Sequence, residues 1–282
     1  MHITKENKIA IFLFAGLFIY LVLRAYFVPF VSDEAGTFFF FIQNGKFIPP
    51  DVHWDANNHI LNSALSFLSY QLFGPSPFAL RLPNVLMFAL YFYFLVKIAG
   101  KLSNKWLKWT FIISLSLAHN FIEFFALTRG YGMSMALLFA AIWYLMQVLD
   151  QGTLRYYFAS CLFISLAILA NLTLINTAFI FVFLLITAVF YSAHMNKERI
   201  SYKALAIIFT TTILPMVLFI RLLFEYKERG LLYYGTLEGF WDLSVRSLMK
   251  LLLESESILL SLSLWPVSYT HLRAHETVVR IS

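Results

Sequence analysis

Two adjacent carboxylates and one arginine are the residues of this sequence best suited to chemistry. Asp33 and Glu34 follow directly after a long apolar run, and Arg129 lies at the end of another, beside Tyr131. A carboxylate at such a boundary can accept a proton from a hydroxyl group, and an arginine fork can hold a phosphate. Two simpler interpretations stay open: the carboxylates complement a helix N-terminus, and Arg129 pairs with Glu123, about two helical turns earlier.

The composition places these groups in a membrane protein. Of the 282 residues, 60% are hydrophobic, 18% aromatic and 13% charged, whereas soluble domains are about 45–50% apolar and about 25% charged. A water-soluble globule, a disordered chain and a collagen-like fibre are therefore excluded. The formal charge of +6 does not indicate a nucleic-acid partner, because the basic residues lie between apolar runs, where membrane topology explains them. The one cysteine, Cys161, provides no disulfide framework and no cysteine metal site.

Apolar runs predict an all-α, polytopic fold, because about 20 apolar helical residues cross a bilayer. The seven predicted spans lie near residues 9–30, 79–99, 109–127, 131–149, 154–170, 172–191 and 204–224, and an eighth is cut off near Trp265.

Residues 59–73 are also mostly apolar, but they predict an amphipathic helix at the membrane interface. Their polar side chains share one helical face, and fifteen residues at about 1.5 Å each reach only about 22 Å. Asn57 or Asn58 can cap this helix, and Gly74 can end it. A second helix can begin with Ser32 as its cap, so the outer loop from residue 31 to about 77 is structured.

The placement of charges predicts a cytoplasmic N-terminus in the inner (plasma) membrane. If residues 59–73 do not cross, the inner loops hold ten lysines and arginines against three acidic residues. The outer side then holds nine basic residues against eleven acidic ones, leaving out the last residues of the chain. This is the positive-inside bias, and it places Asp33 on the outer face.

The last segment, residues 266–282, differs abruptly from the rest. From Val267 to Thr277 it resembles a translated transposase-type sequencing adapter. We therefore expect this segment to be an artefact. Residues 1–265 would then be the N-terminal part of one truncated transmembrane domain, which continues with further spans in the natural protein.

Four motifs occur in order along the first half of the chain: Ser-Asp-Glu-Ala-Gly (32–36), Asn-Asn-His-Ile-Leu-Asn (57–62), Phe-Gly-Pro-Ser-Pro-Phe-Ala-Leu-Arg-Leu-Pro (73–83) and Thr-Arg-Gly-Tyr-Gly-Met (128–133). Together they resemble the polyprenyl-phosphate-dependent membrane glycosyltransferases of the GT-C class, which include protein O-mannosyltransferases and aminoarabinose transferases. The resemblance covers residues 1 to about 255. One departure is that many relatives have His-Pro-Pro or Asp-Pro-Pro where this chain has Asn58-His59-Ile60.

The resemblance implies an enzyme that moves a hexosyl or pentosyl group from a polyprenyl-phosphate donor to a hydroxyl acceptor on a lipid, glycan or protein. It maps the family's catalytic base onto Asp33, with Glu34 as the second carboxylate. Donor phosphate ligands are expected at Arg129, Arg81 and His59, and substrate contacts at Asn58, Asp55, Trp54 and Tyr131. His59 could instead face water, and Arg81 could extend to lipid headgroups.

No cofactor is predicted, and the expected partners are membrane lipids and the lipid-linked sugar donor. Asp51, His53 and Asp55 alternate around Trp54 with a spacing that could hold a divalent ion, but a solvated loop is the favoured interpretation, so no metal ligand is assigned. The alternative function is a membrane lipid or solute transporter. Because the charges gather at one face rather than at the midplane, they favour chemistry at an interface.

Overall fold

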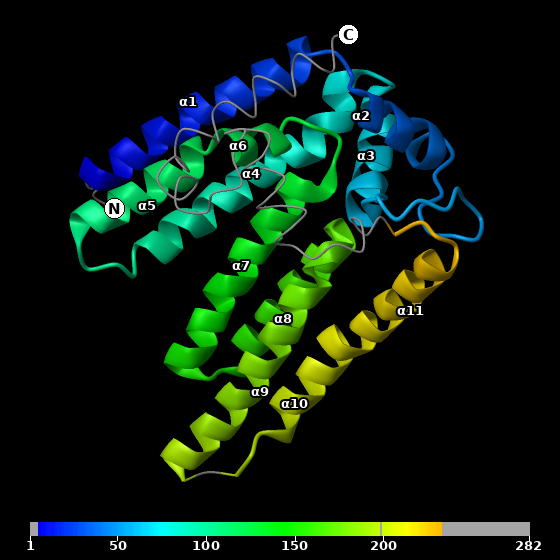
Figure 1. The fold of residues 1–282 in the computed structure, drawn as a ribbon. Helices are drawn as coiled ribbons and strands as arrows, with labels where there is room; N and C mark the ends of the chain where they lie inside the picture. Colours follow the sequence, from blue (N-terminus) through cyan, green and yellow to red (C-terminus); the bar gives the residue numbers. More distant parts are fainter. Residues whose placement is uncertain (1–4, 198, 233–282) are drawn as a thin grey trace, which may run out of the picture. The chain divides into compact units, whose positions relative to one another are not determined.

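The structure is a computed structural model that describes residues 5–197 and 199–232, and its helices belong to one compact unit, Met1–Leu231 (Figure 1). All regular elements in the described part of the chain are helical, which confirms the predicted all-α polytopic fold. The predicted eighth span and residues 266–282 lie outside the described residues.

The elements follow one another with short connections, except in the stretch between residues 43 and 59. The order is α1 (Lys5–Phe27), α2 (Ser32–Thr37), η1 (Phe38–Ile42), α3 (Ile60–Phe73), α4 (Pro77–Ala99), α5 (Lys105–Leu117), α6 (His119–Phe124), α7 (Gly130–Gln151), α8 (Leu154–Ala170), η2 (Leu172–Leu174), α9 (Ile175–Asn196), α10 (Tyr202–Ile208), η3 (Phe209–Ile213) and α11 (Leu214–Glu228). Both η1 and η3 are π-helical, and η2 is a 3₁₀ turn.

Five helical stretches in the described residues are long and apolar enough to cross a membrane. They are Glu6–Phe27, Pro77–Ala99, Gly130–Gln151, Leu172–Met195 and Tyr202–Glu228. The predicted span at 154–170 forms α8 with the predicted bounds, but its 17 residues make it a shorter apolar helix.

The predicted span at 109–127 is wrong as one continuous helix. The chain breaks at Ala118, whose ψ of 106° is not helical, and α5 and α6 on either side are both too short to cross. The break occurs where polar side chains interrupt the run. Glu123 contacts the His119 ring and forms an ion pair with Arg24 of α1 at 3.3 Å, so a polar contact ties this turn of the chain to α1.

Helices α1 and α4 pack antiparallel and carry much of the core (Figure 1). Leu21 of α1 and Phe88 and Leu95 of α4 belong to one buried cluster, which also includes Ile112 and Phe125 from the following segments. Because the end of α1 lies beside the start of α4, the loop between them leaves and returns at the same end. If residues 59–73 do not cross the membrane, α1 must end and α4 must begin on the same side, and the structure has this arrangement.

The α3 helix is amphipathic as predicted, but its polar face points into the protein. Ser66 and Ser69 are buried against α4, while Leu72 is 76% exposed. The serine face of α3 is buried because α4 has a carbonyl there that needs a donor. Pro83 has no N–H to donate to the carbonyl of Ala79, one turn earlier. The Ser69 hydroxyl donates to that carbonyl at 2.5 Å, and Ser66 donates to the next one, at Leu80, at 2.9 Å.

The ends of α3 were partly predicted. Gly74 is the C-cap with φ 81°, a backbone conformation that favours glycine, so the predicted stop is confirmed. At the other end, His59 is the N-cap residue, and neither Asn57 nor Asn58 caps the helix with its side chain. Likewise Ser32 is the first residue of α2 rather than its cap, which is Val31.

Candidate active site

Most predicted site residues meet where α1 ends and α3, α4 and α7 begin. At the centre, Glu34 and Arg81 form a bidentate ion pair, and both side chains are fully buried. Arg81 Nε donates to Glu34 Oε1 at 2.8 Å, and Nη2 donates to Oε2 at 2.5 Å.

All remaining N–H groups of Arg81 are also used inside the protein. They donate to carbonyl oxygens at the end of α1 and just after it: Ala25 at 3.1 Å, Val28 at 2.6 Å and Pro29 at 3.0 Å. Glu34 in turn accepts from the backbone N–H of Thr128 at 2.7 Å and of Val31 at 3.2 Å. Arg81 therefore has no donor left for a phosphate, and Glu34 has no exposed oxygen for catalysis. We revise both predicted assignments: these residues join α1, α2, α4 and the chain before α7.

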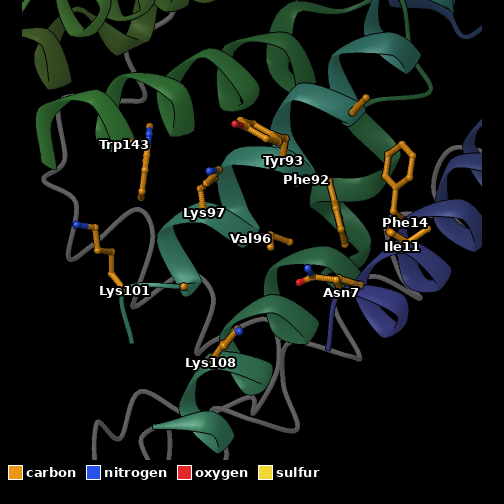
Figure 2. A pocket seen from close by; sticks show the side chains of 13 residues that line it. Asn7, Ile11, Phe14, Phe92, Tyr93, Val96, Lys97, Lys101, Lys108 and Trp143 are labelled. Carbon is orange, nitrogen blue, oxygen red and sulfur yellow. The ribbon is translucent and has the colours of Figure 1, made fainter. Parts of the chain in front are cut away.

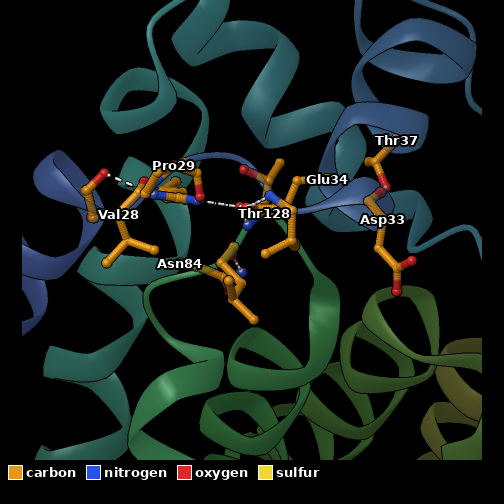
Figure 3. Close-up of polar contacts among 11 residues, drawn as sticks. Val28, Pro29, Asp33, Glu34, Thr37, Asn84 and Thr128 are labelled. Atoms are coloured by element: carbon orange, nitrogen blue, oxygen red, sulfur yellow. Dashed lines mark hydrogen bonds and ion pairs between the residues drawn. The ribbon is translucent and has the colours of Figure 1, made fainter. Parts of the chain in front are cut away.

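Asp33 lies on the opposite side of α2 from this pair, and its side chain is 63% exposed (Figure 3). Its Oδ2 atom is 3.9 Å from Nη2 of Arg129. The adjacent carboxylates are thus separated into different environments, because successive residues of a helix point about 100° apart. Asp33 is the one that a substrate can reach.

Arg129 is buried beside this open carboxylate, with 6% of its side chain exposed. Its Nη1 donates to the hydroxyl of Thr37 at 3.3 Å, but Nε and Nη2 have no hydrogen-bond partner among the described residues. The predicted alternative, a pair with Glu123, is wrong, because Glu123 contacts Arg24 at 3.3 Å and His119 instead. Arg129 therefore presents, in a buried position, two nitrogen atoms, Nε and Nη2, without a described hydrogen-bond acceptor.

His59 completes the cluster from the start of α3. Its ring is 4% exposed, lies edge-on to Tyr131 at 4.5 Å, and places Nδ1 2.8 Å from the carbonyl oxygen of Ala170. Burial, and next the charge of Arg129, lower the pKa of His59 to about 3, so the ring is neutral. Since a carbonyl can only accept, Nδ1 carries the proton, and Nε2 is an acceptor without a described partner.

This state of His59 changes its predicted role. A neutral ring whose free nitrogen is unprotonated repels a phosphate oxygen but accepts a hydrogen bond from a hydroxyl. The predicted role of His59 as a ligand of the donor phosphate is therefore not supported, and its Nε2 is available to a hydroxyl donor. The alternative in which His59 faces water is wrong, because the ring is buried.

Gly130 makes this arrangement sterically possible. A Cβ atom at this position would lie 2.0 Å from the Ala170 carbonyl oxygen and 2.8 Å from the Cβ of His59. Only glycine lets the first turn of α7 come so close to the end of α8 and the start of α3.

The predicted substrate-contact residues lie in different settings. Asn58 is buried, donates to the Phe47 carbonyl at 2.8 Å and accepts from Ser63 at 3.0 Å, so it holds the loop together. Tyr131 lies in the cluster, between His59 and the Arg129 guanidinium carbon, which is 5.8 Å from its ring centroid.

Trp54 and Asp55 come earlier in the loop than Asn58, and Trp54 lies near the end of α11, where its ring contacts that of Tyr226. The Arg229 guanidinium carbon is 3.7 Å from the Trp54 ring centroid, and Asp55 accepts from the backbone N–H of Asn57 at 2.8 Å. Asn57 in turn lies 3.5 Å from the Tyr131 hydroxyl, which connects this part of the loop to the cluster.

Two supporting residues were not predicted. Thr37 contacts Arg129, and the amide nitrogen of Asn84 on α4 lies within hydrogen-bond distance of three acceptors that share its two N–H groups: Asn62 Oδ1 at 3.1 Å, the Leu127 carbonyl at 2.6 Å and the Arg129 carbonyl. Asn84 therefore fixes the backbone that carries Arg129. A polar amide inside an otherwise apolar predicted span is the sequence signal that could have identified it.

No group of three potential metal ligands occurs among residues 5–197 and 199–232. The carboxylates and imidazole of residues 51–55 do not form a ligand set. Instead, the His53 ring stacks on Phe40 at 4.4 Å.

The helical architecture and the buried ionic groups at one end of the spans define a polytopic membrane protein with a polar site at its helix ends. The family model of the dolichyl-phosphate-mannose-protein mannosyltransferases matches residues 60–219, more than half of the chain. The chain belongs to this family, and it is a membrane glycosyltransferase of the GT-C type. This confirms the resemblance found in the motifs and replaces the transporter alternative. No curated protein and no solved structure matches the chain significantly.

Proposed function

We propose that this enzyme transfers a sugar from a polyprenyl-phosphate donor to a hydroxyl acceptor, with Arg129 as the phosphate ligand and Asp33 as the catalytic base. The observation that carries the proposal is the Arg129 guanidinium, which is buried beside an exposed carboxylate and has two nitrogen atoms, Nε and Nη2, without a described hydrogen-bond acceptor. Burying a charge with unsatisfied donors is costly, so the position favours an anionic ligand with several oxygens. The phosphate of a lipid-linked sugar has that chemistry.

Arg129 and Asp33 suit the two events of the transfer, which are departure of the phosphate and attack by the acceptor hydroxyl. The acceptor oxygen forms a bond to the anomeric carbon as the bond from that carbon to the phosphate oxygen breaks. Arg129 stabilises the charge that develops on the departing phosphate, and Asp33 takes the proton of the acceptor hydroxyl. When the phosphate binds Arg129, it replaces Asp33 as the partner 3.9 Å away and leaves that carboxylate free to act as a base.

His59 and Tyr131 would orient the sugar or the acceptor. The unpaired Nε2 of His59 accepts from a hydroxyl, and the ring of Tyr131 supports both His59 and Arg129. In the family, transfer is expected to invert the anomeric centre. Trp54 and Asp55 are proposed as more distant substrate contacts.

The outer-face location is supported by charge. The site lies at the start of α4, whereas Lys97 and Lys101 lie at and beyond its other end, about 24 Å away for a helix rising about 1.5 Å per residue. For a protein in the plasma membrane, the positive-inside bias assigns the lysine end of α4 to the cytoplasmic side, and the site then lies on the outer side.

The proposal is tested by measuring sugar transfer in membranes that contain the protein. The donors are polyprenyl-phosphate mannose labelled in the sugar and, for other sugars, the lipid extract of cells grown on labelled monosaccharides. Asp33→Asn should lower the rate by about 100-fold or more, because it removes the base. Arg129→Lys should weaken donor binding, because it keeps the charge and loses the fork.

The matched control is Asp51→Asn, which removes an exposed carboxylate of the same loop and should leave the rate unchanged. Equal transfer by wild type and Asp33→Asn would refute the base assignment. Transfer from a soluble nucleotide sugar in washed membranes, with none from the lipid-linked donors, would refute the donor class.

A further inference from the structure

A hollow lies toward the other end of the spans, between α1, α4 and α5, with one residue from α7 (Figure 2). This groove, which we call the α1–α4 groove, has a volume of about 850 Å³. It is separate from the cluster around Arg81, because the nearest groove residue on α4, Ala89, is eight residues farther along the helix, about 12 Å at about 1.5 Å per residue.

The floor of the α1–α4 groove is apolar. Ile11 and Phe14 of α1 face Phe92 and Val96 of α4 along it (Figure 2). From Lys97 back to Ala89 the floor follows α4 for about 12 Å, at about 1.5 Å per residue. This is a narrow, elongated apolar surface that runs along the direction of the spans, as the acyl chain of a lipid does.

The rim of the groove is cationic. Lys97, Lys101 and Lys108 line it. Lys101 pairs with Asp150, and Lys108 lies 2.8 Å from Glu6, which also receives Lys105 at 3.5 Å. Among the described residues no carboxylate lies within ion-pair distance of Lys97, so four lysines share two carboxylates and the rim keeps a positive charge.

Aromatic rings lie beside the ammonium groups of Lys97 and Lys101. Lys97 Nζ lies 5.5 Å from the Tyr93 ring centroid and 5.8 Å from that of Trp143, and Lys101 Nζ lies 5.6 Å from Trp143 (Figure 2). In Figure 2 the Trp143 indole lies between the two ammonium groups, so Lys97, which lacks a described carboxylate partner, is the cation best placed to meet an anion at the mouth of the apolar groove. Tryptophan at this level is also typical of the membrane–water boundary.

We propose that the α1–α4 groove binds an anionic glycerophospholipid, with its phosphate at Lys97 and one acyl chain along the apolar floor. Charge complementarity selects an anionic headgroup, because the unpaired positive charge is at the rim. The apolar floor selects a lipid over a free phosphate, because the groove extends well below the lysines. The lipid comes from the leaflet on the lysine side, opposite to the sugar-transfer site.

The test is native mass spectrometry of the purified chain, presented with equal amounts of phosphatidylglycerol and phosphatidylcholine that carry the same acyl chains. The wild type should retain phosphatidylglycerol in preference. Lys97→Gln and Lys101→Gln should each lower that retention about fivefold, the equivalent of about 1 kcal/mol per basic residue near an anionic lipid. Lys203→Gln is the matched control, since it removes an exposed lysine on the predicted cytoplasmic side outside the groove.

A second variant tests the floor without changing charge. Ala89→Trp should fill the apolar end and lower retention of the lipid, and glycerol phosphate should not displace the lipid from the wild type. Equal retention of the two lipids would overturn the proposal, as would equal losses in Lys97→Gln and Lys203→Gln, or no effect of Ala89→Trp. Occupation of the groove by another segment of the chain or by a partner helix would give the first of these results.

Discussion

Arg81 and Glu34 lie 47 residues apart in the sequence and form a fully buried, bidentate ion pair between α4 and α2. Every N–H of the guanidinium has an acceptor, three of them backbone carbonyls at or just after the end of α1. The pair fixes the start of α2, and therefore also the side of the helix on which the next residue back, Asp33, is presented. A structural pair thus positions a proposed catalytic group without contacting the substrate.

Arg81→Gln should destabilise the protein by about 3–5 kcal/mol, because it leaves the Glu34 charge buried without its partner. Thermal unfolding in detergent, followed by intrinsic fluorescence, measures the loss. Arg221→Gln is the control: it removes an arginine that is 81% exposed and paired with Glu225 on the same helix, and it should change stability by less than about 0.5 kcal/mol. Equal melting of the two variants would contradict the structural role.

His59 should make the stability of the protein sensitive to mild acid. In the folded protein its pKa is lowered to about 3, whereas an unfolded histidine titrates near 6.5. Between these values the unfolded state binds the proton and the folded state does not. The stabilising contribution is therefore complete above about pH 6.5 and is lost progressively as the pH falls toward about 3.

Lowering the pH from about 7.5 to about 5 should accordingly cost the wild type about 2 kcal/mol more than His59→Gln, which cannot titrate. The measurement is the unfolding free energy of both proteins at the two pH values. If the two proteins lose stability in parallel, His59 is not buried in its neutral form.

Gly130→Ala should destabilise the site by about 1–3 kcal/mol, because the added methyl group would overlap the Ala170 carbonyl and press on His59. Donor binding should weaken with it. Gly16→Ala is the matched control within α1: no atom lies within 4 Å of its added Cβ, so helix propensity alone should leave it neutral or slightly more stable. Similar melting of both variants would show that the close approach at Gly130 is absent.

Ser69 and Pro83 should show energetic coupling. Ser69→Ala leaves the buried carbonyl of Ala79 without a donor and should cost about 1–3 kcal/mol. Pro83→Ala restores a backbone N–H one turn after that carbonyl, so Ser69→Ala should cost less in its background. A double-mutant cycle measures the difference. Strictly additive losses would show that the Ser69 hydroxyl does not replace the backbone N–H that is missing at Pro83.

Local signals in the sequence predicted many of the helices well. The bounds of α8 and the stop at Gly74 follow from hydrophobic period and a glycine cap, which depend on neighbouring residues. The break at Ala118 was missed, because the run of residues around it is apolar enough to cross a membrane, while its polar residues find partners on α1.

The site was predicted less completely, because its roles depend on distant contacts. The motifs identified Asp33, Arg129, His59 and Tyr131, which the structure brings together. They did not distinguish Asp33 from Glu34, since that distinction arises from Arg81, far away along the chain. The protonation of His59 could not be predicted either, because it depends on a carbonyl 111 residues away.

The inward polar face of α3 has a consequence for biosynthesis. The hydroxyl groups of Ser66 and Ser69 find their acceptors only on α4, which the ribosome makes afterwards. Until α4 emerges, α3 has a row of unpaired hydroxyls and no reason to leave the aqueous surface or the translocation channel. The α3 helix should therefore take its final position at the membrane interface only once α4 has inserted beside it, so α4 acts as an internal chaperone for the helix that precedes it.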